Sequence, residues 1–371
     1  MKVALVHDWL TGMRGGERCL EVFCELFPDA DLFTLLHVPA SVSPVIERRR
    51  IVTSFIQRLP GVARGYRRYL PLFPFAISRF DLRGYDLVLS SSHAVAKSVR
   101  VPAGTLHVCY CFTPMRYVWD LYDDYFGRSA SIATRLVMPF LAAWLRRWDR
   151  RTAARVDHFV AISHFVADRI ERAYGRTADV IYPPVEVSRF RIDETPGDYY
   201  LVVSALAPYK RVDVAILAAN RLERRLLVVG TGTEERRLRP LAGPLVEFLG
   251  GCSDLEIADL YAGCRALLFP TMEDFGITPL EAMASGRPVI ALGQGGALET
   301  VVPPGGSEPP TGIFFGRQTV EELMLAIRDF ERHPGRFEPK ALRRRAETFD
   351  RPVFKERVKA YLDGRLAAHR C

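Results

Sequence analysis

The sequence lacks three features that would assign it to a familiar class of protein. No G-x-G-x-x-G follows a predicted strand, so the dinucleotide fingerprint of a Rossmann dehydrogenase is missing. An apolar stretch at residues 136–145 contains Pro139 and is far shorter than the ~20 residues that a membrane-spanning helix needs. No recognisable nucleic-acid-binding module accompanies the arginines. We therefore expect neither a dehydrogenase, nor a membrane-spanning protein, nor a nucleic acid partner.

The cysteines do not follow the pattern of a small disulfide-bonded domain. Their number, seven, is odd. Cys109 and Cys111 alternate along a predicted strand, which is neither a redox nor a zinc spacing. Residues 2–8 predict a short strand before a glycine turn instead of a signal peptide. We expect reduced thiols, no metal site and a cytoplasmic protein.

Chain length indicates two domains, and the charge distribution indicates that only the first half carries a net positive charge. The chain has 371 residues, of which 49% are hydrophobic and 25% charged, enough for two large cores. Residues 1–185 hold 25 Lys and Arg against 17 Asp and Glu, whereas residues 186–371 hold 26 of each. The net charge of +8 therefore belongs to the first half, which indicates an anionic partner for that half.

Apolar runs and helical patterns alternate throughout the second half. Strands are predicted at 199–206, 226–230, 246–250, 266–269, 288–292 and 312–315, and helices at 210–222, 233–242, 254–263, 279–285 and 319–332. The first half has predicted strands at 2–7, 86–89 and 106–111, a helix after the first glycine loop, and a long helix near 130–155. Such alternation predicts an α/β protein with doubly wound parallel sheets.

Prolines mark a linker at residues 182–198. It predicts a first domain at 1–185 and a second domain at 186–351, with a final helix within 352–371.

The segment from Pro270 to Glu281 carries two carboxylates around a Phe-Gly. Glu273 follows a predicted strand, at the edge where open α/β sheets bind ligands. The amides near Gly276 can approach such a ligand closely. A structural alternative exists for Glu281, because Thr278-Pro-Leu-Glu281 matches a capping box with proline at the first helical position. Glu273 lies outside that helix and has no capping duty.

In the segment from Glu273 to Glu281 the chain resembles the retaining glycosyltransferases of family 4, which carry two glutamates separated by seven residues in the corresponding segment. Further segments share the resemblance: His7-Asp8-Trp9 with Gly15-Gly16-Glu17, Ser92-His93-Ala94, Thr113-Pro114-Met115, Tyr182-Pro183-Pro184 and Tyr209-Lys210-Arg211. Together they run from the start of the chain to about residue 300. The most similar branch is that of bacterial mannosyltransferases that assemble lipopolysaccharide and exopolysaccharide.

The resemblance implies a GT-B fold, with two Rossmann-like domains facing a cleft and a last helix crossing back to the first domain. It implies that the first domain binds the acceptor and the second the nucleotide sugar. Glu281 would then accept ribose hydroxyls and Glu273 would hold hydroxyls of the donor sugar. The remaining donor-site residues implied in the second domain are Gly230, Leu249, Phe275, Gly276 and Ile277.

The diphosphate of the donor is expected to meet Lys210, Arg211 and the amides of Gly15 and Gly16. Gly15-Gly16 opens a predicted helix, where amides and the helix dipole favour anions, although a tight strand–helix turn would look the same. Two cations at a helix start oppose the dipole slightly and are tolerable on a solvated surface, but they become favourable if a diphosphate lies there. In a front-face substitution these groups would stabilise the leaving diphosphate, with no metal and no cofactor besides the donor.

Two positions depart from the family pattern. Ala205 stands where the family has an arginine, and Phe112 where it has a histidine before Thr-Pro. His93, beside Lys97 at the end of a predicted strand, is either a cleft residue or an ordinary structural histidine. These departures keep open a non-catalytic nucleotide-sugar- or polysaccharide-binding protein. A sugar phosphorylase of the same fold is a further alternative.

Two segments of the first half mix arginines with aromatic or apolar residues, at 55–80 and 136–151. Such segments are typical of a face that meets anionic lipid, although a solvated helix face is the plain alternative. We therefore expect transfer of a hexose, mannose first, from a GDP- or UDP-linked sugar to a polyprenyl-diphosphate-linked glycan. The protein would be peripheral at the inner face of the membrane.

Overall fold

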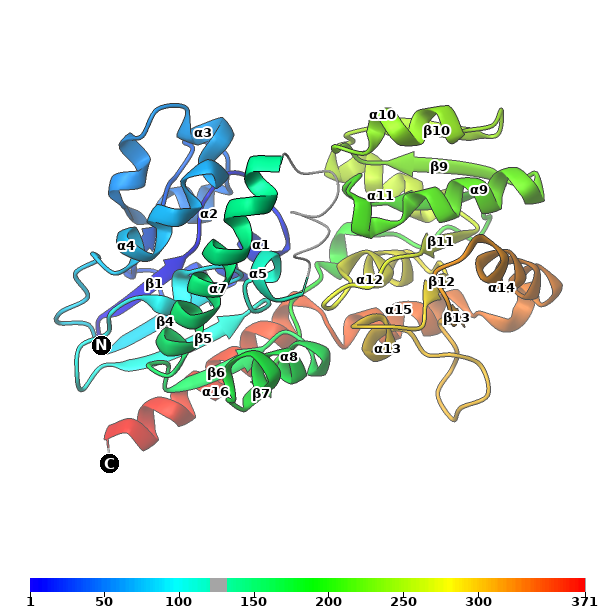
Figure 1. The fold of residues 1–371 in the computed structure, drawn as a ribbon. Helices are drawn as coiled ribbons and strands as arrows, with labels where there is room; N and C mark the ends of the chain where they lie inside the picture. Colours follow the sequence, from blue (N-terminus) through cyan, green and yellow to red (C-terminus); the bar gives the residue numbers. More distant parts are fainter. Residues whose placement is uncertain (121–131, 371) are drawn as a thin grey trace. The chain divides into compact units, whose positions relative to one another are not determined.

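A computed structural model describes residues 1–120 and 132–370. The chain forms two compact units, each built on its own sheet (Figure 1). Unit 1 comprises Met1–Pro183 together with Phe354–Cys371, and unit 2 comprises Pro184–Val353.

Unit 1 contains a parallel sheet of seven strands in the order β3-β2-β1-β4-β5-β6-β7. The strands are β1 Val3–His7, β2 Asp31–Thr34, β3 Arg50–Thr53, β4 Leu87–Ser92, β5 Leu106–Cys111, β6 His158–Ala161 and β7 Ala178–Val180. The central strands β1, β4 and β5 are buried along their whole length, as expected where helices cover both faces of a parallel sheet. The strands β2 and β3 lie on one side of β1, and the later strands β4 to β7 lie on its other side. The sheet therefore reverses direction between β1 and β4, the kind of switch point where α/β proteins bind ligands.

The helices of unit 1 differ greatly in length. They are α1 Gly15–Leu26, α2 Pro44–Glu47, α3 Val62–Gly65, α4 Phe73–Ile77, α5 Arg116–Trp119, α7 Ile132–Ala153 and α8 His164–Tyr174, with α16 Arg351–Arg370 at the chain's end. The stretch between β3 and β4 folds as short helices and 3₁₀ turns around an aromatic core, in which Trp9 packs on Tyr66 and Phe73 with ring centroids 4.9 and 6.1 Å away. Pro60, Pro71 and Pro74 interrupt this stretch, which explains why no long helix forms there.

The final helix α16 packs on unit 1, as the resemblance implied. Phe354 is buried against Phe23 and Tyr110, at ring centroid distances of 5.9 and 5.7 Å. Lys355 Nζ adds an ion pair of 3.0 Å with Glu25 Oε2.

Unit 2 contains a parallel sheet of six strands in the order β10-β9-β8-β11-β12-β13. The strands are β8 Tyr199–Val203, β9 Arg225–Val229, β10 Val246–Gly250, β11 Ala266–Phe269, β12 Val289–Leu292 and β13 Gly312–Phe315. The helices are α9 Val212–Leu222, α10 Glu235–Leu238, α11 Asp254–Gly263, α12 Ile277–Ala284, α13 Ala297–Thr300, α14 Val320–Arg332 and α15 Pro339–Glu347. Each apolar run of the second half that predicted a strand is a strand. The switch point of this sheet lies between β8 and β11.

The predicted capping box at the start of α12 is wrong. The helix begins at Ile277, and Gly276 is its N-cap with φ +89°. Pro279 is therefore the third helical residue and Glu281 lies in the second turn, out of reach of a capping position. A glycine in the left-handed region starts the helix earlier than the proline alone indicates.

None of the helices in the described part of the chain combines the length and the apolar character needed to cross a membrane.

Candidate functional site

The switch point of unit 2 brings Lys210 and Glu273 together. Lys210 ends a 3₁₀ turn, Pro208–Lys210, that follows β8, and Glu273 lies in the loop after β11. Since β8 and β11 are neighbours, their carboxyl ends place the Lys210 ammonium in an ion pair with the Glu273 carboxylate. Their side chains are only 16% and 13% exposed. The Lys210 ammonium also lies 5.2 Å from the centre of the Tyr209 ring. Both residues were predicted as site residues from the sequence.

Hydrogen bonds tie the two loops that carry this pair. Thr271 Oγ1 donates to the carbonyl of Tyr209 at 3.3 Å, and Gln318 Nε2 donates to the carbonyl of Pro270 at 2.7 Å. The first bond holds the loop after β8 against the loop after β11, and the second ties the loop after β11 to the segment after β13. These two side chains therefore hold the loops that carry the lysine and the glutamate. Neither Thr271 nor Gln318 has a sequence pattern that points to this role.

Arg211 is the N-cap of α9 and is held by its own helix. Its Nε donates to Asp213 Oδ1 at 3.1 Å, and its Nη1 lies 3.5 Å from Gln318 Oε1. Each of the two cations at this helix start therefore has a carboxylate partner within unit 2. Glu273 offsets Lys210 and Asp213 offsets Arg211.

Glu281 is oriented by a buried tyrosine. Tyr261, on α11, donates its hydroxyl proton to Glu281 Oε2 at 3.0 Å. Burial, with the charge and hydrogen bond of Glu281, raises the pKa of Tyr261 well above its ordinary value. The phenol thus stays a donor, and Glu281 can offer its carboxylate as an acceptor. No sequence spacing links the two residues, and Tyr261 could not have been found from the pattern.

The Glu273 loop rests closely on the loop after β12. Gly296 N donates to the carbonyl of Glu273 at 2.9 Å, and Gly295 pairs with Glu273 as an isolated bridge. Gly295 has φ +67°, and a Cβ there would collide with the Glu273 carbonyl. The glycine pair at 295–296 thus has a structural reason, the close approach of two backbones.

The remaining predicted residues of unit 2 lie around the same edge of the sheet. Gly230 follows β9 and donates its N–H to the carbonyl of Gly250 at 2.7 Å, beside Leu249 in β10. Phe275 is buried, with its ring 5.8 Å from that of Phe349, so its side chain belongs to the core and only its backbone is available to a ligand. Ile277 is the first residue of α12.

In unit 1, Asp8 organises the corresponding switch point. Its buried carboxylate accepts four backbone N–H groups, those of residues 93 to 96, at 2.7 to 2.9 Å. Asp8 follows β1 and the loop follows β4, so this clamp spans the two neighbouring strands. The His93 ring Nδ1 lies 3.3 Å from Asp8 Oδ2, and burial lowers the pKa of His93 although Asp8 opposes the shift. His93 is thereby positioned by both its backbone and its ring.

His7 and Glu17 form a second buried pair beside the glycine loop. His7 Nδ1 lies 2.8 Å from Ser91 Oγ, and His7 Nε2 lies 3.7 Å from Glu17 Oε1. Burial raises the pKa of Glu17, but the neighbouring imidazole of His7 outweighs it and holds the pKa below its ordinary value. Glu17 also accepts the N–H of Arg14 at 3.1 Å, at the N-cap of α1.

Gly15 and Gly16 are the first residues of α1. A Cβ on Gly16 would lie 3.3 Å from the Phe112 ring and 3.7 Å from His7. The Phe112 ring centroid is 6.4 Å from that of His7 and 6.3 Å from that of His93. A side chain at position 16 would therefore crowd the Phe112 ring, which gives this glycine a packing reason besides any ligand.

Lys97 belongs to the core and does not support a cleft role for His93. It is 1% exposed and forms an ion pair with Asp149. Trp119 Nε1 and the Tyr174 hydroxyl donate to the other oxygen of Asp149 at 2.9 and 2.8 Å. Asp149, on α7, completes this network from far along the chain, which the sequence did not indicate.

No group of His, Cys, Asp and Glu in the described residues has the arrangement of a metal site. The chain contains one Asp-x-Asp, the pattern typical of metal-dependent transferases, at Asp29–Asp31. Asp31, however, accepts a hydrogen bond from the Tyr85 hydroxyl and lies 3.3 Å from Arg50 Nη1. It stands at the start of β2, away from the carboxyl edge of the sheet.

Gly15, Gly16 and His93 are residues of unit 1, and the other predicted site residues belong to unit 2. Gly15, Gly16 and His93 lie at the switch point of the first sheet. Lys210 and Glu273 lie at that of the second, with Gly230 after β9 and Leu249 in β10 farther along the same edge.

Two family models match the chain almost end to end. Residues 13–189 match Glycosyltransferase Family 4, and residues 186–349 match Glycosyl transferases group 1. The chain belongs to the family 4 glycosyltransferases.

Curated relatives match parts of the chain. A GDP-mannose-dependent alpha-mannosyltransferase of Mycolicibacterium smegmatis is 33% identical over 174 residues, covering 44% of this chain and 46% of the relative. The O-antigen chain mannosyltransferase of Salmonella typhimurium is 30% identical over 182 residues, covering 44% and 52%. The chain thus spans about half the length of the curated relatives it matches.

Solved structures match over the whole chain. The crystal structure of Anabaena HepE in complex with UDP has a TM-score of 0.72 and 17% identity, covering 98% of this chain and all of that one. The sucrose-phosphate synthase of Thermosynechococcus elongatus has a TM-score of 0.73 and 18% identity, covering 99% and 100%. These likenesses show the fold, GT-B with two Rossmann-like domains, as the resemblance implied.

Proposed function

We propose that the chain is a retaining hexosyltransferase that moves a hexose, mannose first, from a nucleotide-diphosphate sugar to a lipid-linked or polysaccharide acceptor. The observation that carries the proposal is the Lys210–Glu273 pair at the switch point of the second sheet. The relatives named as mannosyltransferases support mannose, and one of them is named for GDP-mannose. HepE, which has the same fold, was solved with UDP. We therefore propose a GDP- or UDP-linked donor.

The pair suits a ligand that joins a diphosphate to a sugar. Without a donor, Lys210 and Glu273 are each other's counter-ion. A diphosphate would compete with Glu273 for the lysine, since a charge-assisted hydrogen bond contributes about 1.5–3 kcal/mol. Glu273 would then be free to accept hydroxyls of the adjacent sugar. Glu281, oriented by Tyr261, would accept the ribose hydroxyls.

The proposed reaction is a front-face substitution at the anomeric carbon. Lys210 stabilises the charge that develops on the leaving diphosphate, and the amides of Gly15 and Gly16 are proposed to assist it, as is Arg211. The bond from the anomeric carbon to the phosphate oxygen breaks on the face where the acceptor oxygen forms its bond. The freed phosphate oxygen takes the acceptor's proton, so configuration is retained and no cofactor besides the donor is needed.

We propose that unit 1 meets the acceptor, a polyprenyl-diphosphate-linked glycan, at the inner face of the membrane. The net charge of +8 lies within residues 1–185. Large apolar side chains are exposed in both segments that the sequence singled out, among them Phe75 and Phe140. A basic surface with exposed apolar side chains is suited to an anionic lipid surface.

The first test is thermal stabilisation by GDP, UDP, ADP, CDP and NAD. A ligand at ~100 times its dissociation constant stabilises the folded state by about 2.7 kcal/mol, a readable shift. We expect one nucleoside diphosphate to stabilise the protein, Glu281→Ala to lose the shift, and the exposed control Glu194→Ala to keep it. Transfer from the matching sugar nucleotide, with the anomeric configuration of the product read by NMR, completes the test. Stabilisation by none of them in a folded protein would contradict the proposal.

A non-catalytic sugar-nucleotide-binding protein is the second candidate. The observation that favours it is Phe112, whose ring packs near His7 and His93 where the family has a histidine. Ala205, exposed just after β8, likewise replaces a cation. Nucleotide binding without transfer to any lipid-linked acceptor would favour this candidate.

A further inference from the structure

A basic hollow of about 530 Å³ on unit 1 has no part in the proposed chemistry. It is lined by Trp119 of α5 and by Arg146, Arg147, Arg150 and Arg151 of α7. Within residues 1–120 and 132–370, no carboxylate lies at ion-pair distance from Arg147, Arg150 or Arg151. Asp149, on the same helix, is buried and faces Lys97 instead. Clustered guanidinium groups repel one another, so this hollow is stabilised by an anion.

Two of the arginines are fixed before any ligand arrives. Arg146 Nε donates to the carbonyl of Val118, and Arg150 Nε donates to the carbonyl of Ala173 at 2.8 Å. Both guanidinium groups lie over the Trp119 ring, 5.9 and 5.5 Å from its centre. Trp119 is itself held by its indole N–H on Asp149 at 2.9 Å. This floor is rigid, and its outer N–H groups suit the forked recognition of a phosphate.

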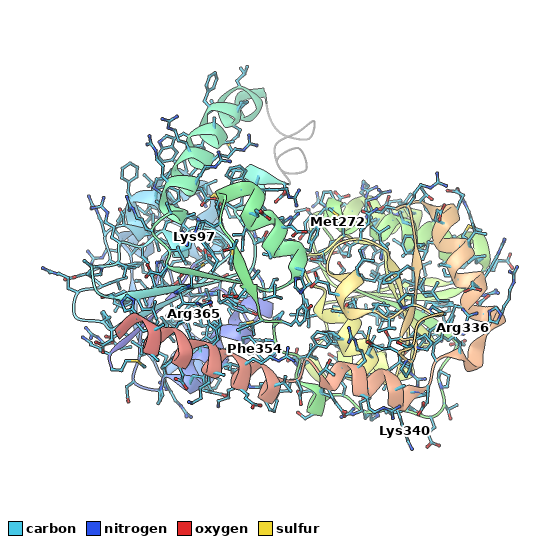
Figure 2. All side chains as sticks on the ribbon, turned by 90° about the horizontal axis from the view of Figure 1, so that it is seen from below. Lys97, Met272, Arg336, Lys340, Phe354 and Arg365 are labelled. Carbon is cyan, nitrogen blue, oxygen red and sulfur yellow. The ribbon has the colours of Figure 1, made fainter. Side chains whose placement is uncertain are left out.

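The same helix carries an apolar stripe, which indicates what kind of molecule carries the anionic group. Leu136, Val137, Phe140 and Trp144 are 67%, 62%, 80% and 41% exposed. Their spacing continues through Arg147 and Arg151, so one face of α7 runs from apolar to basic. In Figure 2 the N-terminal half of α7 stands clear of the other elements of unit 1 that are drawn.

The dimensions of the stripe match a membrane interface. Phe140 and Arg147 are about 10 Å apart along the helix at 1.5 Å per residue. Amphipathic elements place their apolar side chains about 5–10 Å into the boundary between headgroups and acyl chains. Phosphate would then lie at the level of the arginines while Phe140 reaches the acyl chains.

We propose that this hollow binds the phosphate or diphosphate headgroup of a membrane lipid, with the apolar stripe of α7 entering the same leaflet. Arg146 and Arg150 on Trp119 form its floor, and Arg147 and Arg151 form its rim. The inference deepens the proposed function by assigning the lipid partner of unit 1, and it rests on that function only in taking a lipid as the partner.

The test compares two variants that remove the same charge. Arg147→Gln/Arg151→Gln removes the rim, and Arg100→Gln/Arg155→Gln removes two exposed arginines outside the hollow. Binding to vesicles of phosphatidylglycerol in phosphatidylcholine is measured by co-sedimentation. We expect the rim variant to bind about thirtyfold more weakly, the effect of two arginines at an anionic surface, with the control within about twofold of wild type. Equal effects of the two variants would overturn the proposal.

A second measurement separates a lipid headgroup from free phosphate. Inorganic pyrophosphate is titrated while tryptophan fluorescence is followed, with Trp119→Phe identifying the signal of the floor. Phe140→Ser should lower vesicle binding and leave the pyrophosphate titration unchanged. Pyrophosphate binding without vesicle binding would overturn the lipid assignment, and neither kind of binding would overturn the site.

The result of the vesicle and pyrophosphate measurements can be separated from the test of the donor site in unit 2. The stabilisation of each variant by a nucleoside diphosphate, which reports on unit 2, should equal that of wild type. If that stabilisation is absent from wild type while vesicles bind, the proposed function fails and the lipid site stands.

Discussion

The Lys210 ammonium and the Glu273 carboxylate form an ion pair at the carboxyl ends of two neighbouring strands, β8 and β11. Both side chains are mostly buried, so their attraction is less screened than that of a surface pair. A ligand that separates them has to satisfy both, with an anion for the lysine and donors for the glutamate. A diphosphate with a hexose attached offers both within one ligand. We therefore expect the pair to favour a sugar nucleotide over the free nucleoside diphosphate, which satisfies the lysine alone.

Substitution of the two glutamates should separate turnover from nucleotide affinity. Glu273→Gln removes the charge that we propose holds the sugar hydroxyls, and we expect kcat to fall on the order of 100-fold, the loss typical of a group acting at the reacting centre. Affinity for the nucleoside diphosphate should stay within a few-fold. Glu281→Ala should instead weaken nucleotide binding more than it lowers kcat. Steady-state kinetics and calorimetry check this, and equal effects of both variants on both quantities would contradict the division of roles.

Tyr261→Phe should weaken nucleotide binding indirectly, because Tyr261 is expected to act through Glu281 and not to contact the ligand. The hydroxyl that orients Glu281 is lost, while the ring stays in the core. A typical hydrogen bond contributes about 1 kcal/mol, so the dissociation constant should rise about fivefold. Tyr199→Phe is the matched control, because its hydroxyl donates to the Leu260 carbonyl away from Glu281. A dissociation constant unchanged by Tyr261→Phe would show that Glu281 needs no such support.

Gly230→Ala should destabilise unit 2. Gly230 has φ +130°, and a Cβ there would collide with the Ser204 carbonyl. A side chain in such a backbone region costs about 1–3 kcal/mol even before the collision, so we expect a loss of at least about 2 kcal/mol in thermal or urea unfolding. Gly316→Ala meets no atom within 4 Å and should change stability little. Equal stability of the two variants would mean that the loop between β9 and α10 relaxes freely.

Stability should fall between pH 6.5 and pH 4 because of His107. Burial lowers its pKa from 6.5 to about 4, so the unfolded state binds more protons than the folded state in this interval. The stabilisation is fully present above pH 6.5 and is lost as the pH falls. The shift corresponds to roughly 3 kcal/mol. In His107→Gln the slope of unfolding free energy against pH should be flatter, whereas the exposed control His333→Gln should keep it. An unchanged slope in His107→Gln would show that this histidine does not cause the pH dependence of stability.

The sequence predicts unit 2 well because of how its strands are buried. Strands covered on both faces are short continuous apolar runs, such as Ala266–Phe269, and helical periodicity fills the intervals between them. Unit 1 is less readable. The strands β2, β3, β6 and β7 read DLFT, RIVT, HFVA and ADV, so each contains a polar residue and none is a continuous apolar run.

Within the site, the sequence predicts the residues that follow strands and misses those that support them. The sequence singles out Glu273 because it follows an apolar run at the edge where ligands bind, and Lys210 because it opens a predicted helix within a segment that resembles the family. Tyr261 and Gln318 act through contacts with segments distant in the sequence, which no local spacing records. Lys97 shows the converse case. It looks like a cleft residue beside His93, until Asp149 supplies a buried partner from α7.

The packing of Phe354 between Phe23 and Tyr110 sets an order of events during synthesis. The first sheet leaves the ribosome before any of unit 2, yet the apolar patch that α16 covers stays open until α16 has emerged. Domains generally fold in the order in which they are made, but unit 1 is complete only after all of unit 2 has been made. A chain stalled inside unit 2 would display that patch to chaperones and proteases, so ribosomes that fail to finish would yield products that the cell can recognise and remove.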